Sequence, residues 1–307
     1  MSNHNSEARY RRRDVLATAC AATVAGVPSG TKLDKAVAAT ASGPRRILHR
    51  SSAPDLAYDD LGAGDSALLF TPGWCVGRRV FASLPARCCE QRRVLALDWR
   101  GHGDSGAVPG DFGDTELVND AVDLIRATGL RRVIPVALAH SGWIALELRR
   151  RMGAVVDRIV LIDWIVADPP APFLAALDAL QDPKRWREAR DQLFAMWVRG
   201  VGRPDLERFI YGDMGSYEFD MWSRAGREIS RAYAQFGSPL NAMAAFEPVV
   251  PVLHLYAQPE DPGYLMAQQS YADAHPWFHV HRLRAQSHFP MFEVPSDLAI
   301  AINNFAT

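Results

Sequence analysis

One stretch of the chain could place a single side chain for chemistry at the end of a strand. An apolar run over residues 133–138 predicts a buried strand, and helical spacing resumes after a tight turn of small residues. The residue at the tip of such a turn is lifted over the sheet. If Ser141 were the tip, Trp143 would lie where strand and helix approach closely and a small residue is needed. If Ala139 is the tip, Ala137 and Ser141 flank it, and close packing favours this second register.

This strand–turn–helix pattern resembles the nucleophile elbow of the α/β-hydrolase fold. An alanine at the tip has no hydroxyl group and cannot form an acyl-enzyme. We therefore expect a hydrolase scaffold without the hydrolase nucleophile, whose chemistry depends on a base and a pocket. A serine esterase that uses Ser141 is the alternative if the first register holds.

His288 is the leading candidate for the base. It follows the last predicted strand, in the loop where the α/β-hydrolase fold carries its catalytic histidine. A base histidine needs a carboxylate on its other ring nitrogen. Asp163 directly follows an apolar strand, where an unpaired carboxylate would be costly, whereas Glu260 lies in a Gln-Pro-Glu-Asp-Pro run that equally fits a solvated turn. We favour Asp163, and we expect His102 to be a structural loop histidine.

The remaining pattern fits an α/β-hydrolase fold, with a mostly parallel central sheet flanked by helices and an inserted helical cap. We assign residues 46–168 and 247–307 to the core and residues 169–246, which begin with a proline-punctuated stretch, to the cap. Some cap residues could line an apolar pocket or equally form the cap's own core: Trp186, Phe194, Met196, Trp197, Trp222 and Tyr233.

Residues 1–45 differ in composition from the rest and predict a segment outside the fold. Arg12-Arg13 precede a short, alanine-rich apolar stretch, and this pattern resembles a twin-arginine export signal. The alternative is a disordered basic tail, in which case a cytoplasmic location is expected. The apolar part is too short to span a bilayer as a mature helix.

Composition argues against several classes of function. A net charge of −1 and a hydrophobic fraction of 48% fit an ordinary soluble core and give no indication of a nucleic-acid partner. The chain has no HExxH motif. Neither a disulfide framework nor a zinc site is expected from the spacing of its four cysteines, which are Cys20, Cys75, Cys88 and Cys89. Nothing in the sequence indicates an oligomeric state.

Several short stretches carry a more specific resemblance. They are Pro72-Gly73-Trp74-Cys75, Trp99-Arg100-Gly101-His102-Gly103, His140-x-Gly142-Trp143, Asp163-Trp164, Asp182-Pro183-Lys184-Arg185-Trp186-Arg187-Glu188, Leu193-Phe194-x-x-Trp197, His275-Pro276-Trp277-Phe278 and His288-Phe289-Pro290. Through them, the chain from about Asp60 to Phe305 resembles the cofactor-independent 2,4-dioxygenases of 3-hydroxy-4(1H)-quinolones. This family includes the 3-hydroxy-4-oxoquinaldine dioxygenase type and relatives that degrade alkylquinolone signals.

The resemblance implies roles for particular residues. His288 would be the base, paired with Asp163. The best-known members of the family carry serine at the elbow tip, where this chain has Ala139. The other positions implied to contact the substrate or its oxyanion are Trp74 at the oxyanion hole, His140 after the tip, and Trp197 in the substrate cavity.

The resemblance also implies the reaction. The substrate would be a planar 3-hydroxy-4(1H)-quinolone with a 2-methyl or 2-alkyl group, cleaved with O2 to carbon monoxide and an N-acylanthranilate, with no metal or flavin. Val76 replaces a histidine of the family, which indicates a different or bulkier ring substituent. A non-catalytic quinolone-binding protein is an alternative, since the tip hydroxyl is absent.

Overall fold

The computed structural model describes residues 45–90 and 92–307. The predicted export signal or tail, together with Cys20, therefore lies outside the described residues, except for Arg45 at its end.

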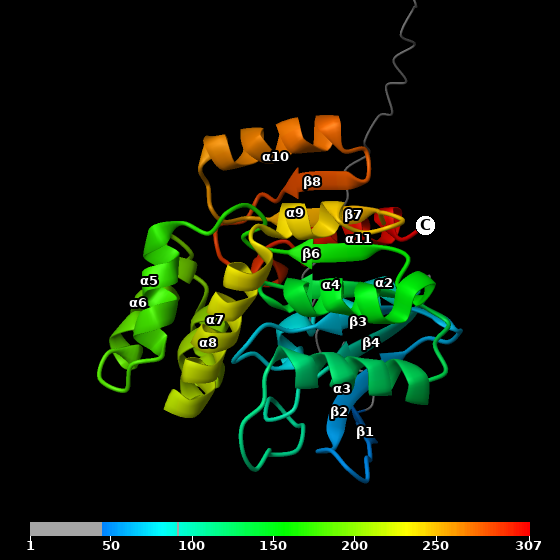
Figure 1. Ribbon diagram of the computed structural model, residues 1–307, viewed down its shortest axis with the longest axis horizontal. Helices are drawn as coiled ribbons and strands as arrows, with labels where there is room; N and C mark the ends of the chain where they lie inside the picture. The colour runs from blue at the N-terminus through cyan, green and yellow to red at the C-terminus, as the bar shows by residue number, and fades with distance from the viewer. Residues whose placement is uncertain (1–44, 91) are drawn as a thin grey trace, which may run out of the picture.

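The described residues form an eight-stranded sheet in the order β1-β2-β4-β3-β5-β6-β7-β8 (Figure 1). Strand β2 pairs antiparallel with both β1 and β4, and every other pair of neighbours is parallel. The strands are β1 (Arg45–Leu48), β2 (Leu56–Leu61), β3 (Ser66–Thr71), β4 (Arg93–Leu97), β5 (Arg132–Leu138), β6 (Ile159–Ile162), β7 (Val252–Tyr256) and β8 (Phe278–Arg282). In β5 only Arg132 is exposed, as expected for a parallel strand covered on both faces.

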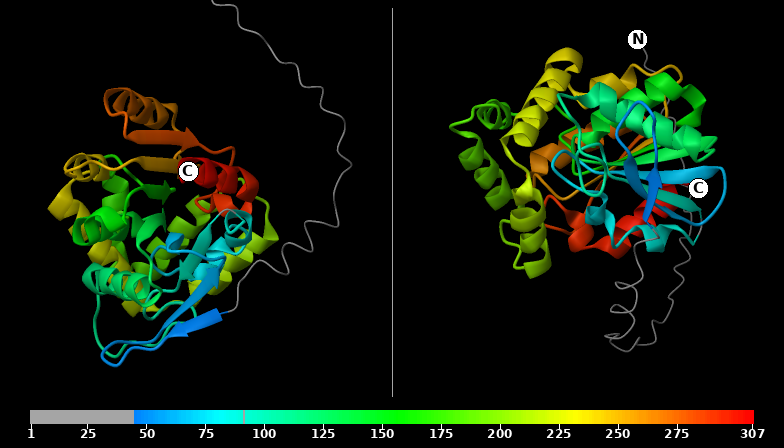
Figure 2. Two further views of the ribbon diagram at one scale, coloured as in Figure 1. Left: turned by 90° about the vertical axis from the view of Figure 1, so that its right-hand side faces the viewer. Right: turned by 90° about the horizontal axis from the view of Figure 1, so that it is seen from below.

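Helices cover both faces of the sheet. Helices α3 (Asp114–Ala127) and α4 (Ser141–Met152) pack together on one face, and α2 (Pro85–Cys88) packs with α11 (Pro295–Phe305). Figure 2 shows α11 on the opposite side of the sheet from α3 and α4. Helix α10 (Pro262–Ala274) contacts the edge strand β8. The 3-10 segments among these elements are η1 (Arg78–Phe81), η2 (Gly153–Val155) and η5 (Pro290–Phe292).

Between β6 and β7 the described chain is helical. These inserted helices are α5 (Ala171–Leu180), α6 (Trp186–Trp197), α7 (Pro204–Glu207), the π-helix η3 (Arg208–Asp213), the 3-10 segment η4 (Met214–Ser216), α8 (Phe219–Phe236) and α9 (Pro239–Ala244). Helices α5, α6 and α8 contact one another and lie beyond the carboxyl ends of the strands (Figure 1). They occupy the region that the sequence assigned to a cap.

The carboxyl ends of the parallel strands are where the fold can build a site. Strands β3 and β5 are neighbours, and from this pair the strand order runs outward in both directions. Ligands of open α/β sheets bind beside such a switch point. A mostly parallel sheet covered by helices confirms the predicted α/β fold class.

Candidate active site

The turn after β5 has the predicted elbow geometry, with Ala139 at its tip. Ala139 has φ 50°, a left-handed conformation that is uncommon for a residue with a side chain. Its backbone N–H donates to Ile162 O at 2.8 Å, and helix α4 begins two residues later. Ser141 is 1% exposed, and its hydroxyl donates to Thr71 Oγ1 at 2.8 Å. The Ala139 register is therefore confirmed, and Ser141 lies within the protein rather than at the tip.

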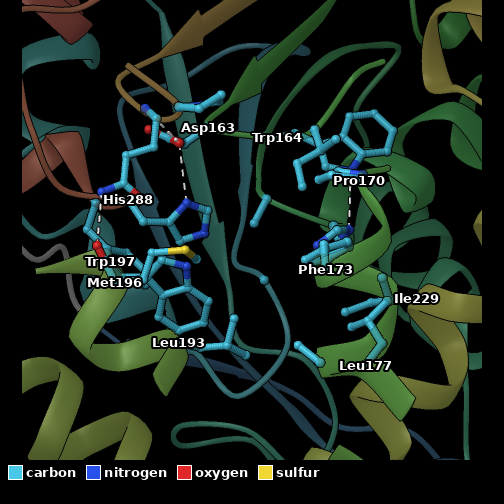
Figure 3. A pocket seen from close by; sticks show the side chains of 18 of the residues that line it. Asp163, Trp164, Pro170, Phe173, Leu177, Leu193, Met196, Trp197, Ile229 and His288 are labelled. Carbon is cyan, nitrogen blue, oxygen red and sulfur yellow. Dashed lines mark hydrogen bonds and ion pairs between the residues drawn. The ribbon is translucent and has the colours of Figure 1, made fainter. Parts of the chain in front are cut away.

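Asp163 directly follows β6, His288 lies in the loop after β8, and the two side chains meet on one side of the cavity (Figure 3). His288 Nδ1 lies 3.3 Å from Asp163 Oδ1, which is the ring nitrogen and the carboxylate that the sequence paired. The His288 backbone N–H donates to Trp197 O at 3.2 Å, and its ring stacks on Trp197 with centroids 4.9 Å apart. Because Nδ1 faces Asp163, Nε2 is left on the other edge of the ring, free to accept a proton.

The carboxylate of Asp163 is held by the loop that follows β7. Ala257 N–H donates to Oδ2 at 2.9 Å, and Gln258 N–H lies 3.4 Å from Oδ1. Burial raises the pKa of Asp163 above its ordinary value, while the hydrogen bonds from His288 and these two backbone groups oppose the shift. An orienting carboxylate held in this way keeps the proton of a neutral His288 on Nδ1.

Two backbone N–H groups point to an oxyanion hole. Among the described residues, neither the N–H of Trp74 nor that of His140 donates to a protein acceptor. They belong to the turns after β3 and β5, which are neighbouring strands, and both residues line the same cavity. Two such donors can stabilise negative charge that develops on a substrate oxygen.

His102 supports the Trp74 turn from outside the cavity. Its Nε2 accepts the Cys75 N–H at 3.1 Å, and its Nδ1–H donates to Arg100 O at 2.9 Å. Cys75 itself has φ 59°, so this bond fixes a left-handed residue directly after Trp74. This contact agrees with the structural role expected for His102.

A single large cavity connects these groups. Its volume is about 1000 Å³, at the upper end of the range for small-molecule sites. Apolar side chains of α5, α6 and α8 form much of its wall, among them Leu177, Leu193 and Ile229 (Figure 3). The structure brings together in its lining all six residues that the sequence singled out, which are Trp74, Ala139, His140, Asp163, Trp197 and His288.

The loop after β7 contributes residues that the sequence did not identify. Gln258 Nε2 donates to Gln286 O at 2.7 Å and to Met196 O at 3.3 Å, so it ties α6 to the loop that carries the base. Glu260, the competing candidate for the orienting acid, lines the cavity but makes no hydrogen bond to another described residue. Only the Gln-Pro-Glu-Asp-Pro composition marked this loop, and that composition equally fits a solvated turn.

Desolvation keeps three histidines neutral in the folded protein. It lowers the pKa of His102 to about 4, that of His140 to about 3 and that of His254 to about 4. An unfolded histidine titrates near 6.5. Between pH 6.5 and about 4 the unfolded state therefore binds more protons, so these residues make the protein less stable as the pH falls.

Replacing His254 with glutamine is expected to weaken this pH dependence. His254 is buried in β7, and its Nδ1–H donates to Gln268 Oε1 at 2.6 Å. The amide N–H of a glutamine at position 254 can donate to the same oxygen. Between pH 6.5 and 5, the free energy of unfolding of the wild type should fall more steeply than that of His254→Gln, by up to about 1.4 kcal/mol per pH unit. Urea unfolding at several pH values measures both slopes. Equal slopes would contradict the assignment, and the exposed His279→Gln serves as control.

The described residues contain no candidate metal site and no candidate membrane span. No group of three or more His, Cys, Asp or Glu side chains among them is arranged to hold a metal ion. No helix in residues 45–90 and 92–307 is long and apolar enough to cross a membrane.

Comparison with known proteins places this chain in a family. The profile of the "Alpha/beta hydrolase family" matches residues 68–301. A 2-heptyl-3-hydroxy-4(1H)-quinolone dioxygenase of Mycobacteroides abscessus is 35% identical over 246 residues, which are 80% of this chain and 91% of that protein. A 1H-3-hydroxy-4-oxoquinoline 2,4-dioxygenase of Pseudomonas putida is 30% identical over 252 residues, or 81% of this chain and 95% of that protein.

A solved structure gives the same result. An AqdC variant in complex with its substrate, from work on ring cleavage of the Pseudomonas quinolone signal, superposes with a TM-score of 0.80 and 32% identity. The match covers 85% of this chain and 99% of that one. The chain therefore belongs to the alpha/beta hydrolase family and, within it, to the family of 3-hydroxy-4-quinolone 2,4-dioxygenases.

Proposed function

We propose that this protein cleaves the heterocyclic ring of a 2-alkyl-3-hydroxy-4(1H)-quinolone with O2, giving carbon monoxide and an N-acylanthranilate. The observation that carries the proposal is the His288–Asp163 pair at a large, mostly apolar cavity that Ala139, the tip of the elbow, also lines. This arrangement has a base, an oriented carboxylate and two oxyanion donors, but no nucleophile.

The reaction begins with removal of the substrate's 3-hydroxyl proton by Nε2 of His288. The anion is electron-rich and supplies the electrons that reduce O2, so the reaction needs no external reductant. A peroxide forms at C2 and closes on C4. The O–O bond and both bonds of C3 to the ring then break, and C3 leaves as carbon monoxide with its own oxygen. One atom of O2 enters the new acyl group, and the other enters the carboxylate.

The cavity wall accounts for the choice of an alkyl-substituted substrate. The apolar residues of α5, α6 and α8 give a surface that a quinolone ring and a hydrocarbon chain can bury without leaving polar groups unpaired. Val76 lines the same cavity and adds a hydrophobic contact there. A substrate that lies against this apolar wall is shielded from water on that side, which protects the reactive anion.

The esterase alternative predicts a different response to substitution at the elbow. Ser141→Ala should keep kcat within about threefold of wild type, because the change removes one buried hydrogen bond to Thr71, worth about 1 kcal/mol of stability. Ala139→Ser should also retain most of the turnover, since no step of the proposed reaction uses a nucleophile. Steady-state kinetics and labelling with a fluorophosphonate test this, and loss of labelling and turnover in Ser141→Ala would favour the esterase.

The direct test separates binding from chemistry. The protein is mixed anaerobically with a 2-alkyl-3-hydroxy-4(1H)-quinolone, oxygen is admitted, and O2 uptake and carbon monoxide are measured. Equal amounts of both gases are expected, with 18O2 delivering label to the N-acylanthranilate and none to the carbon monoxide. Tight binding with no O2 uptake would instead identify a quinolone-binding protein.

A further inference from the structure

Trp164 makes a hydrogen bond that sets the protonation of His140. The indole Nε1–H of Trp164 lies 3.2 Å from His140 Nδ1 and donates to it. A ring nitrogen that accepts a hydrogen bond carries no proton, so a neutral His140 holds its single proton on Nε2. His140 is therefore a hydrogen-bond donor through Nε2.

The indole of Trp164 is fixed in place by packing. Trp164 is 1% exposed and makes an edge contact with Trp143, with ring centroids 5.1 Å apart. A β-carbon at Gly142 would overlap the six-membered ring of Trp164, so the first turn of α4 can lie against the indole only with glycine at this position. Trp164 O also accepts the Tyr264 hydroxyl at 3.2 Å.

His140 lies between aromatic rings at the cavity wall. Its ring stacks on Phe173 of α5 with centroids 5.4 Å apart, and it meets the edge of Tyr233 of α8 at 5.9 Å. Desolvation lowers the pKa of His140 to about 3, so the imidazole is neutral at neutral pH. A neutral imidazole with a fixed Nε2–H can polarise an oxygen without giving up its proton.

Two neighbouring residues at the end of β6 thus act on two imidazoles in opposite ways. Asp163 accepts from His288, which leaves a lone pair on Nε2 of that ring. Trp164 donates to His140, which leaves a proton on Nε2 of the other ring. Both imidazoles line one cavity, and Figure 3 shows Trp164 and His288 on opposite sides of it.

We propose that Trp164 is a positioning residue that fixes His140 as a neutral Nε2–H donor to an oxygen of the substrate anion. The proposal rests on the proposed function, since it assigns the second imidazole of that site. The base removes a proton on one side of the substrate while the donor stabilises the resulting charge from the other. The donor binds the anion more strongly than the neutral substrate, so its loss should appear in kcat more than in KM.

Trp164→Phe tests the proposal because it removes the indole N–H and keeps an aromatic ring. We expect kcat to fall about 10-fold with little change in KM, less than the roughly 10²-fold loss expected for His140→Phe, which removes the donor itself. In the His140→Phe background, Trp164→Phe should cause no further loss of kcat. Additive losses in the double variant would overturn the proposal.

Trp143→Phe is the matched control. It truncates a neighbouring buried tryptophan in the same way, but the Trp143 indole nitrogen has no partner among the described residues, so no hydrogen bond is lost. The control should keep kcat close to wild type. Equal losses in Trp143→Phe and Trp164→Phe would show a packing effect and overturn the proposal.

A spectroscopic measurement separates this proposal from the proposed function. In protein with 15N-labelled histidine, His140 should show a protonated Nε2 and an unprotonated Nδ1, and Trp164→Phe should shift it towards a mixture of tautomers. The same tautomer ratio in both proteins would overturn the proposal, whatever the activity. If the wild type shows the expected tautomers but no ring cleavage, the proposed function is overturned, and with it the contact between His140 and a quinolone anion. The effect of Trp164 on the His140 tautomer would still stand.

Discussion

Replacing His288 with alanine is expected to reduce kcat for quinolone ring cleavage by about 10²–10⁴-fold at neutral pH. The imidazole is the group whose free Nε2 can take the 3-hydroxyl proton, because Nδ1 is engaged by Asp163 at 3.3 Å. Anaerobic binding of the quinolone should be weakened much less, since Trp197 and the apolar wall remain. Single-turnover kinetics after addition of O2 measure the chemical step directly.

The pH dependence of this variant distinguishes a missing base from a damaged cavity. The base is needed only to remove the 3-hydroxyl proton. The loss of kcat in His288→Ala should therefore become smaller as the pH rises towards the pKa of the bound substrate, because the substrate then ionises without a base. His281→Ala changes an exposed histidine of β8 outside the cavity and should leave kcat unchanged. Wild-type turnover in His288→Ala at neutral pH would refute the assignment of the base.

Local sterics explain why the elbow could be predicted from the sequence. The choice between Ala139 and Ser141 depended on which neighbours must be small, and the left-handed φ of Ala139 bears out that choice. The orienting acid followed from a similar local argument. Asp163 ends an apolar strand, and a carboxylate there must find a partner, which it does in His288.

Helix α10 shows where the sequence argument failed. No helix was predicted between β7 and β8, yet α10 covers thirteen residues there. Gln268 is its one buried residue, so the helix has no apolar stripe that a periodicity analysis could detect.

The aromatic residues of the inserted helices could not be sorted from sequence either. Met196, Trp197 and Trp222 line the cavity, whereas Trp186, Phe194 and Tyr233 pack away from it. Trp186 and Trp197 lie on the same helix, α6, and only the way α6 packs against α5 and α8 decides which of them faces the cavity. That packing depends on contacts far apart in the sequence.

Replacing Asp163 with asparagine should be almost as damaging as losing the base itself. Asparagine tolerates the φ of 48° found at this position and can still accept the Ala257 N–H through its amide oxygen. Its amide nitrogen would then face His288 Nδ1 and donate to it. That bond moves the imidazole proton to Nε2, where it blocks proton abstraction, and a comparable tautomer change in serine proteases lowers kcat by about 10⁴-fold.

Glu260→Gln is the control for this prediction, because Glu260 was the other carboxylate considered for the role and also lines the cavity. It should retain wild-type kcat, since it makes no hydrogen bond to His288 in the described part of the chain. Thermal unfolding of both variants shows whether any loss comes from the fold, and 15N spectra of His288 report the tautomer directly. If Glu260→Gln loses turnover while Asp163→Asn keeps it, the loop after β7 supplies the orienting acid and the pairing at the end of β6 has no catalytic role.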